Sequence, residues 1–238
     1  MFDADAMLFP TGVGHEVRFG IDNGPGVRMV TANLPHFAIW QKPGAPFVGA
    51  GTGSGNFVRG AQLNVPQIQR ATADYMGMLA TVMNAMALQD ACESIGLETR
   101  VLSSIDVPNV AEKWIRRRAM RHLEKRRVVI IAAGTGNPHF TTDTAAAQRA
   151  IELGCDVIIK ATKVDGVYDK DPKKHKDAKR YERVTYLEAL QKGLRFMDAT
   201  AVALCMEHKM PLIVLDMKAS GDVERAMKGE KVGTLIEA

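Results

Sequence analysis

The chain has 238 residues, of which 46% are hydrophobic and 24% charged, and its net charge is +4. These values are typical of a globular protein and exclude a disordered or fibrous one, while the mild positive charge suits an anionic small ligand. No stretch approaches the roughly 20 apolar residues of a membrane span, and no signal peptide opens the chain, so we expect a cytoplasmic protein without membrane contact. The cysteines, Cys92, Cys155 and Cys205, are too far apart for a CxxC site, and we expect no resident metal site.

The first quarter of the chain differs in composition from the rest. Residues 1–65 hold 8 of the 58 charged side chains, and five of the ten prolines fall within the first 50 residues. Because prolines and glycines interrupt regular elements, we expect short strands at most over residues 1–50. We expect one domain over residues 1–238, in which segment 1–50 is atypical.

From about Asn64 onward, the sequence alternates between helical and strand-like patterns. The Ala-, Met- and Leu-rich stretch over 73–95 predicts a long helix that is capped by Thr72 or Asp74. Short apolar runs bounded by charge or glycine predict buried parallel strands. In chain order we expect a strand over 100–104, a basic helix over 109–126, strands over 128–131, 156–160 and 211–215, and helical stretches over 143–153 and 186–208. This alternation indicates an α/β fold with a mostly parallel sheet that is covered on both faces.

The turn after strand 128–131 is the most informative motif. It reads GTGNPHFTTD from Gly134 to Asp143 and leads into the next helix. Its glycines let backbone N–H groups approach a ligand, and Thr141 and Thr142 offer hydroxyls at a helix N-terminus, which favours an anion such as phosphate. The alternative is an ordinary strand-to-helix connection with a threonine cap. The chain lacks the Walker A, HExxH and GxSxG sequences of other common phosphate-binding and hydrolytic sites.

Two further polar turns follow candidate strands, at the sheet edge where parallel α/β folds bind ligands. The loop Gly51–Gly60 is rich in glycine and contains Arg59, whose guanidinium could bind phosphate oxygens in a bidentate manner. The other turn offers Lys160 and Lys163 to a transferring phosphoryl group and the ring of Tyr168 to a base. The alternatives are a flexible surface loop and a solvated lysine-rich turn.

Basic residues cluster in the helix over 109–126. Six arginines and lysines lie between Arg116 and Arg126. A solvated face is one interpretation, and a site for an effector phosphate or a subunit contact is another. We do not expect nucleic acid as a partner, because no aromatic residues interleave with these charges.

Five stretches together resemble the bacterial uridylate (UMP) kinases of the amino-acid-kinase superfamily, in the order and at the spacing of that family. They are ADYMGMLATVMN from Ala73, AGTGNPHFTTD from Ala133, KATKVDGVY from Lys160, MDAT from Met197 and GEKVGTLI from Gly229. The match covers residues 51–238. The resemblance implies a three-layer α/β/α sandwich with a mostly parallel central sheet, and transfer of the ATP γ-phosphate to UMP with Mg²⁺. It also implies a homohexamer in pyrimidine nucleotide biosynthesis whose effectors are GTP and UTP.

Matching the motifs position by position implies roles for individual residues. Lys160 would lie beside the transferring group, with Asp143 and Asp198 organising lysines or metal. Thr142 would lie near the UMP phosphate, and Asp74 near the sugar or uracil. The full set of UMP contacts implied is Ser54, Asp74, Thr135, Gly136, Asn137, Pro138, His139, Phe140, Thr141 and Thr142. The implied ATP contacts are Gly55, Arg59, Thr162, Tyr168 and Asp171, and Arg127 would contact the effector GTP.

The N-terminal segment departs from the family pattern. Family members open with a K-x-S-G-E turn whose lysine bridges the phosphates, whereas the only lysine here before Lys113 is Lys42, in a different context. One alternative is therefore a catalytically impaired nucleotide-binding relative. A more distant alternative is a kinase that acts on a carboxylate or carbamate, although the stretches from Ala73 and Ala133 weigh against it.

A short island, Phe19–Asp22, matches the family again, while residues 23–47 do not. This arrangement suggests a disturbed reading frame or a wrong start in the gene. Resequencing the 5′ end of the gene tests that hypothesis, and a clean read of the same residues would end it.

Overall fold

The structure is a computed structural model that describes most of the chain from Gln67 onward. It gives residues 67–172, 174–216 and 221–238 with their side chains. Before them, it gives backbone strands alone over residues 16–22, 27–33, 37–41 and 49–52.

Eleven strands within the described residues form two sheets. Strands β1 and β2 pair antiparallel as a hairpin, and the other nine form one sheet in the order β6-β5-β7-β4-β3-β8-β10-β11-β9. Strands β6, β5, β7, β4, β8 and β10 run parallel to one another, whereas β3, β11 and β9 run the opposite way. Their bounds are β1 Glu16–Asp22, β2 Val27–Asn33, β3 Phe37–Gln41, β4 Gly49–Thr52, β5 Thr99–Ser103, β6 Glu112–Lys113, β7 Val128–Ala132, β8 Val157–Thr162, β9 Arg183–Thr185, β10 Leu212–Asp216 and β11 Thr234–Glu237.

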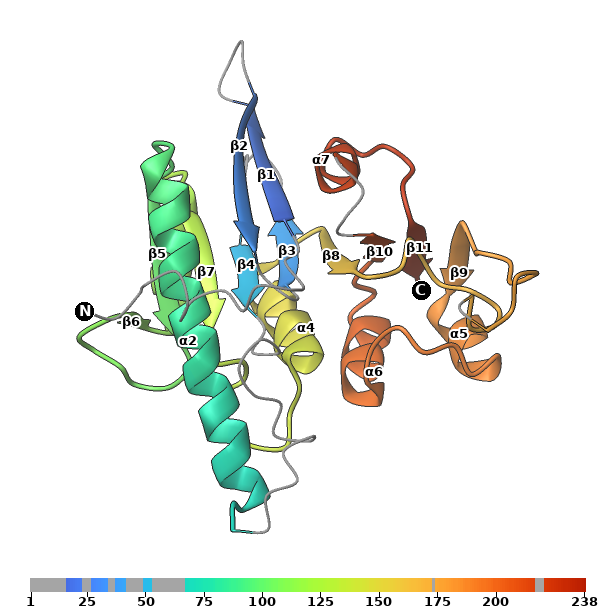
Figure 1. The fold of residues 1–238 in the computed structure, drawn as a ribbon, viewed down its shortest axis with the longest axis horizontal. Coiled ribbons are helices and arrows are strands. Elements are labelled where there is room, and N and C mark those ends of the chain that lie inside the picture. The colour runs from blue at the N-terminus through green and yellow to red at the C-terminus, as the bar shows by residue number, and fades with distance from the viewer. Residues whose placement is uncertain are drawn as a thin grey trace.

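Helices cover the nine-stranded sheet on both faces. On one face, α2 (Arg70–Ser94) packs on β5 and β7, α7 (Asp222–Met227) packs on β8 and β10, and the β1–β2 hairpin contacts both helices (Figure 1). The other face carries α3 (Arg116–Glu124), α4 (Thr142–Leu153), α5 (Tyr186–Gln191) and α6 (Ala199–Glu207). The predicted three-layer α/β/α sandwich is therefore confirmed.

The apolar runs form strands because they can bury both of their faces. Along β7, Ile130 and Ala132 pack with side chains of α2, whereas Val129 and Ile131 pack with side chains of α3 and α4. All four are at most 3% exposed. The alternation has the period of two that a pleated strand imposes, so one short run supplies two separate cores. We call them the α2-side core and the α4-side core.

The three cysteines are free and buried, and they divide between these cores. Cys92 lies in the α2-side core, and Cys155 and Cys205 lie in the α4-side core. Burial disfavours a thiolate and raises the pKa of Cys92 and Cys205 to about 11.

Most predicted elements from residue 64 onward are present. The strands expected over 128–131, 156–160 and 211–215 are β7, β8 and β10, and the helix expected over 143–153 is α4. The helix expected over 73–95 is α2, but its predicted caps are wrong. It begins at Arg70 after Gln69, whose side chain makes no capping hydrogen bond.

The single helix expected over 109–126 is also wrong. Residues 112 and 113 form β6, and the helix α3 begins only at Arg116. The backbone N–H of Trp114 donates to the Ser103 carbonyl at 2.8 Å, which continues the pairing of β6 with β5. Pairing with a neighbouring strand thus overrides the helical propensity of this segment.

The stretch expected to be helical over 186–208 contains two helices. Gly193 adopts the left-handed conformation (φ 64°) after α5, where the Leu194 N–H donates to the Ala189 carbonyl at 2.9 Å. The Asp198 carboxylate then caps α6 by accepting from the Ala201 N–H at 3.1 Å. The glycine ends one helix and the aspartate begins the next.

The described residues before residue 53 form four strands, of which two lie in the middle of the main sheet. Strand β3 pairs antiparallel with both β4 and β8, and β4 also pairs with β7. The predicted start of the loop Gly51–Gly60 is wrong, because Gly51 and Thr52 belong to β4. The remainder of that loop lies outside the described residues.

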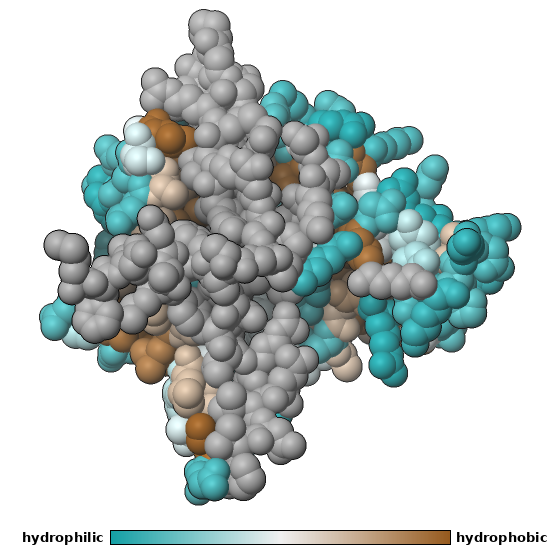
Figure 2. Space-filling view, viewed as in Figure 1, coloured by the Kyte–Doolittle hydropathy of each residue, from teal (hydrophilic) through white to brown (hydrophobic). Residues whose placement is uncertain are grey.

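Helix α2 leaves a stripe of apolar side chains exposed. Figure 2 shows apolar atoms gathered over the part of the molecule where α2 runs in Figure 1. Among the residues with described side chains, the stripe consists of Tyr75, Met76, Leu79, Met83 and Met86, which are 40–49% exposed. No helix in the described part of the chain has both the length and the hydropathy to cross a bilayer.

Candidate active site

The carboxyl ends of the parallel strands gather polar side chains at one edge of the sheet. Strand β5 leads to Ser104, β7 leads to the loop over residues 133–142, and β8 ends at Thr162. Because β5, β7 and β8 run in the same direction, all three ends lie at the same edge. This is the edge at which open α/β sheets bind ligands.

The loop over 133–142 leaves β7 through a tight left-handed turn. Ala133 has φ 62°, and its N–H donates to the Thr81 hydroxyl of α2 at 2.6 Å. The Gly136 N–H then closes the turn on the Ala133 carbonyl at 2.9 Å, with Gly136 at φ 82°. Beyond the turn, the side chains of Asn137, His139, Phe140, Thr141 and Thr142 are exposed. The loop is therefore anchored at its start and open to solvent at its tip.

Thr141 caps the helix that follows the loop. Its hydroxyl oxygen accepts from the N–H groups of Asp143 at 3.1 Å and Thr144 at 3.2 Å. The Asp198 carboxylate accepts hydrogen bonds from the hydroxyls of Thr141 and Thr144, the latter at 3.1 Å. Asp198 thus joins the N-termini of α4 and α6, and it acts on the loop through Thr141.

Asp74 connects α2 with the tip of the same loop. Its carboxylate accepts from the His139 N–H at 2.9 Å and from the Arg70 guanidinium at 3.0 Å. Burial alone would raise the pKa of the Asp74 carboxyl, but the hydrogen bonds from His139 and Arg70 outweigh it and lower that pKa. Asp74 therefore carries a negative charge beside the loop at neutral pH.

Lys160 lies beneath the start of α4. Its ammonium donates to the Asp143 carboxylate at 2.6 Å and to the Phe196 carbonyl at 2.6 Å. Lys160 is 21% exposed and Asp143 28%, so the pair is partly screened from solvent and still accessible. This arrangement puts an ion pair, with its ammonium held in a fixed position, at the junction of β8, α4 and the segment before α6.

The residues after β8 form a second polar group at the same edge. The Thr162 hydroxyl accepts from the Val164 N–H at 3.1 Å and so closes the turn. The Tyr168 hydroxyl donates to Asp165 at 2.7 Å, which raises the pKa of that tyrosine. Asp171 is exposed, and its carbonyl accepts from two backbone N–H groups of the following turn.

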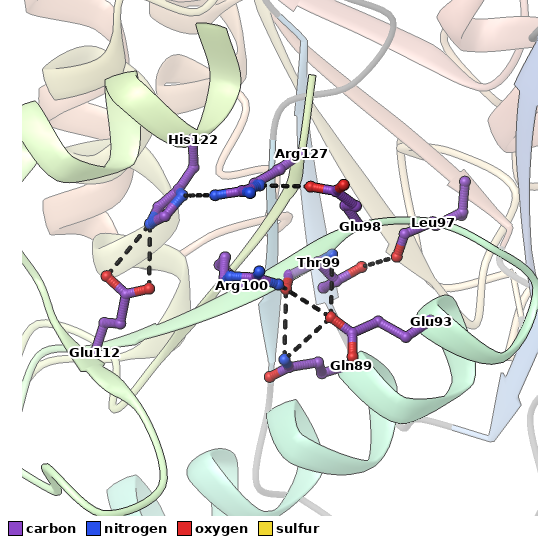
Figure 3. Close-up of polar contacts among 9 residues, drawn as sticks. All are labelled: Gln89, Glu93, Leu97, Glu98, Thr99, Arg100, Glu112, His122 and Arg127. Atoms are coloured by element: carbon purple, nitrogen blue, oxygen red, sulfur yellow. Dashed lines mark hydrogen bonds and ion pairs between the residues drawn. The ribbon is translucent and has the colours of Figure 1, made fainter. Parts of the chain in front are cut away.

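Arg127 lies at the other edge of the sheet, immediately before β7. Its guanidinium donates to Glu98 at 2.7 Å and lies 3.4 Å from the His122 ring, which in turn contacts Glu112 at 3.2 Å (Figure 3). Because β7 separates Arg127 from the loop over 133–142, this charged group is distinct from the candidate active site. Its predicted contact with GTP stays a prediction.

Three predicted residues, Ser54, Gly55 and Arg59, lie outside the described residues. Of the others, the structure gathers Asp74, Asp143, Lys160 and Asp198 around one loop. Among the described residues, no three His, Cys, Asp or Glu side chains are grouped so that they could hold a metal ion.

The sequence analysis missed Thr81, Ser104 and Arg149, although all three contact the loop or its supports. Thr81 and Ser104 are single hydroxyls in an apolar helix and at a strand end, and Arg149 is one charged residue in the alanine-rich helix α4. Their hydrogen-bond partners lie 30 to 52 residues away in the sequence, so no local sequence pattern indicates these contacts.

Comparison with known proteins places this arrangement in a family. The amino acid kinase family matches residues 44–216. A UMP kinase from Bacillus anthracis is 38% identical, with a TM-score of 0.75 over 78% of this chain and 77% of that one. A UMP kinase from Ureaplasma parvum is 37% identical, with a TM-score of 0.75 over 78% of this chain and 80% of that one. A uridylate kinase from Archaeoglobus fulgidus is 31% identical, with a TM-score of 0.55 over 71% of this chain and 74% of that one. The chain therefore belongs to the amino acid kinase family, and its predicted resemblance to the UMP kinases of that family is confirmed.

Proposed function

We propose that this chain transfers the γ-phosphate of ATP to UMP, giving UDP and ADP. The observation that carries the proposal is the loop over 133–142, which is open at its tip, capped onto α4 by Thr141 and flanked by the charges of Asp74 and Lys160. The similarity to three solved uridylate kinases supports the choice of substrate. The reaction would place the chain in cytoplasmic pyrimidine nucleotide synthesis, with GTP and UTP as effectors.

On the UMP side, the loop offers backbone N–H groups and hydroxyls to an anion. The residues from Thr135 to Thr142 would surround the nucleotide, with Thr142 and the N-terminus of α4 at its phosphate. Asp74 would accept hydrogen bonds from the sugar or the uracil. The Asp74 carboxylate also accepts a hydrogen bond from the His139 N–H, and this bond fixes the position of the carboxylate for the contact with UMP.

On the ATP side, we propose Thr162, Tyr168 and Asp171 for the base and sugar, and Gly55 and Arg59 for the phosphates. Lys160 would face the transferring group, where its charge offsets the negative charge of the phosphoryl oxygens. In the reaction, an oxygen of the UMP phosphate bonds to the γ-phosphorus while the bond to the oxygen of ADP breaks. No covalent intermediate with the protein is needed.

Mg²⁺ would arrive with ATP. It prefers oxygen ligands, and usually binds through one or two carboxylates together with substrate phosphates. Asp143 fits this requirement, because its carboxylate is part-exposed and binds Lys160 through only one of its two oxygens. When bound, the ion supplies positive charge to the phosphates.

A second candidate is a nucleotide-binding relative that turns over slowly. The N-terminal sequence favours this candidate, because it lacks the K-x-S-G-E lysine of the family. Lys42 is the only lysine before Lys113, and its sequence context differs from that motif. Loss of one charge that stabilises the transition state costs about 10²- to 10³-fold in rate, by analogy with removal of an oxyanion donor.

A coupled assay of ADP release with UMP, ATP and Mg²⁺ tests the proposal. We expect UDP formation by the unchanged protein, and a loss of about 10²- to 10³-fold in kcat for Lys160→Gln. Lys192→Gln is the matched control, because it removes an exposed lysine at the C-terminal end of α5 that pairs with Glu188 at 2.7 Å. Binding of UMP in calorimetry without turnover would support the second candidate, and absence of UMP binding would refute both.

A further inference from the structure

Arg149 is a charged side chain buried in the middle of α4. Its side chain is 5% exposed, and a buried guanidinium is costly unless its donors are paired. Glu152, one turn along the helix, accepts from Arg149 Nη1 at 2.8 Å. The guanidinium also lies over the ring of Trp114, at 4.5 Å from its centroid. Glu152 and Trp114 offset the charge of the guanidinium. Neither of these two contacts uses the hydrogens of Nη2.

Arg149 Nη2 donates to the hydroxyl of Ser104 at 3.0 Å, across the sheet edge from α4 to the end of β5. The same hydroxyl donates its own hydrogen to the Gly134 carbonyl at 2.8 Å. Because a hydroxyl has a single hydrogen, the donation from Arg149 fixes its direction toward Gly134. A chain of two hydrogen bonds thus leads from the buried arginine to the start of the loop over 133–142.

Ser104 makes two further contacts, one with the end of β7 and one with the loop. Its N–H donates to the Ala132 carbonyl at 3.1 Å, at the last residue of β7. Its carbonyl oxygen lies against Gly136, where an added Cβ would come within 2.8 Å of it. The positive φ of Gly136 and this close approach together require glycine there. Ser104 is therefore in contact with the loop on both sides of Thr135.

We propose that Arg149 is a positioning residue that acts through Ser104 to hold the turn Gly134–Gly136 in its binding conformation. Helix α4 then fixes the loop twice, through the cap at Thr141 and through Arg149 two turns later. The consequence for substrate rests on the proposed function, since it assumes that this loop binds UMP. The consequence for the loop itself does not.

Hydrogen exchange in the ligand-free protein tests the structural part. The reporters are the N–H groups of Gly136, Asn137 and His139, which are all hydrogen-bonded within the site. We expect Ser104→Ala, which removes only the hydroxyl, to speed exchange of the peptide over 133–142 by about threefold to tenfold. Peptides of α5 should not change. Unchanged exchange of the loop in Ser104→Ala would overturn the proposal.

A double-mutant cycle on UMP binding tests the coupling between the two residues. The variants are Ser104→Ala, Arg149→Met and the pair together, each measured by calorimetry and by steady-state kinetics. Because Arg149 acts through Ser104, we expect the double variant to bind UMP no more weakly than Arg149→Met alone. The KM for UMP should rise about threefold to tenfold while the KM for ATP stays constant. Additive losses, or an equal rise in both KM values, would contradict a role in positioning.

Two further variants separate positioning from general stability. Gln148→Met is the matched control, because it removes a 3.0 Å hydrogen bond to the same Glu152 from a side chain that does not bond to Ser104. Arg149→Lys keeps the charge and should restore part of the UMP affinity that Arg149→Met loses. If the unchanged protein binds no UMP while both Ser104→Ala and Arg149→Met speed loop exchange, the proposed function fails and the role of Arg149 in holding the loop stands.

Discussion

At the scale of single residues, Asp74 shows how one side chain can serve both the fold and a ligand. Its carboxylate accepts from the backbone of His139 and from Arg70 one turn earlier, and it is 12% exposed. Both donors favour the charged form and lower the pKa of Asp74. A group whose pKa is lowered on folding stabilises the protein above its ordinary pKa, and the contribution is lost as the pH falls through the lowered value.

We expect Asp74→Asn to lower the free energy of unfolding at pH 7 by about 0.5–1.5 kcal/mol, since a hydrogen-bonded charge is replaced by a neutral amide. The difference from the unchanged protein should shrink as the pH falls below 3.8, the ordinary value for this carboxyl. Urea denaturation between pH 3 and pH 7 measures it. Asp90→Asn, an exposed change in the same helix, is the control, and a difference that is constant with pH would show that the charge of Asp74 is not involved.

Residue by residue, the sequence could predict the groups that belong to a motif but not their partners. Lys160 and Asp143 were expected to act together, and they form an ion pair. The bond from Asp74 to His139 spans 65 positions, and the one from Arg149 to Ser104 spans 45. Such contacts depend on how β5, β7 and their helices pack, which no local pattern of side chains encodes.

At the scale of elements, the sequence predicts those strands whose boundaries are marked locally, and it fails where a segment pairs with another strand. Runs such as Val128–Ala132 are bounded by charge and glycine and can bury both faces, so their strands were predictable. The sequence predicts a helix that includes the segment before α3, yet residues 112 and 113 pair with β5. Whether these residues form a strand or a helix depends on how far β5 extends beside them. The helical pattern of residues 109–126 contains no information about β5.

The connection into β11 gives a prediction at this scale. Gly233 has φ 66°, and a Cβ there would overlap the Val214 carbonyl oxygen of β10. Gly154, at the end of α4, has nearly the same conformation (φ 65°), with no atom within 4 Å of an added Cβ. We expect Gly154→Ala to cost about 1–2 kcal/mol from backbone conformation alone, and Gly233→Ala roughly 2–5 kcal/mol because the overlap adds to it. Urea denaturation of both variants measures the difference, and equal costs would show that the close approach is absent.

At the scale of the whole molecule, the helical layer that contains α2 leaves a row of apolar side chains uncovered along one helix. The layer with α2 exposes the apolar stripe from Tyr75 to Met86, over which Figure 2 shows apolar atoms at the surface. Contiguous apolar patches of this kind mark contact sites. The homohexamer that we expected from the family resemblance would use such a surface.

We therefore expect the protein to be oligomeric, and light scattering after size-exclusion chromatography to give a mass well above 26.0 kDa. The double change Leu79→Glu and Met83→Glu adds two charges to side chains that are 48% and 49% exposed. It should lower the mass of the assembly, because charges in an apolar contact are left without partners. Lys192→Glu is a control for surface charge on the opposite layer. A single-subunit mass for the unchanged protein would refute the expectation.

The burial of the three cysteines has a practical consequence for following the molecule in solution. Cys92 belongs to the α2-side core, and Cys155 and Cys205 belong to the α4-side core. A thiol reagent reacts with the exposed thiolate, so each cysteine is protected until its own layer opens. The rate of labelling at Cys92, compared with the rates at Cys155 and Cys205, would report how often each side of the sheet opens. The natural sequence thus contains chemical probes for both layers, and no residue has to be changed to install them.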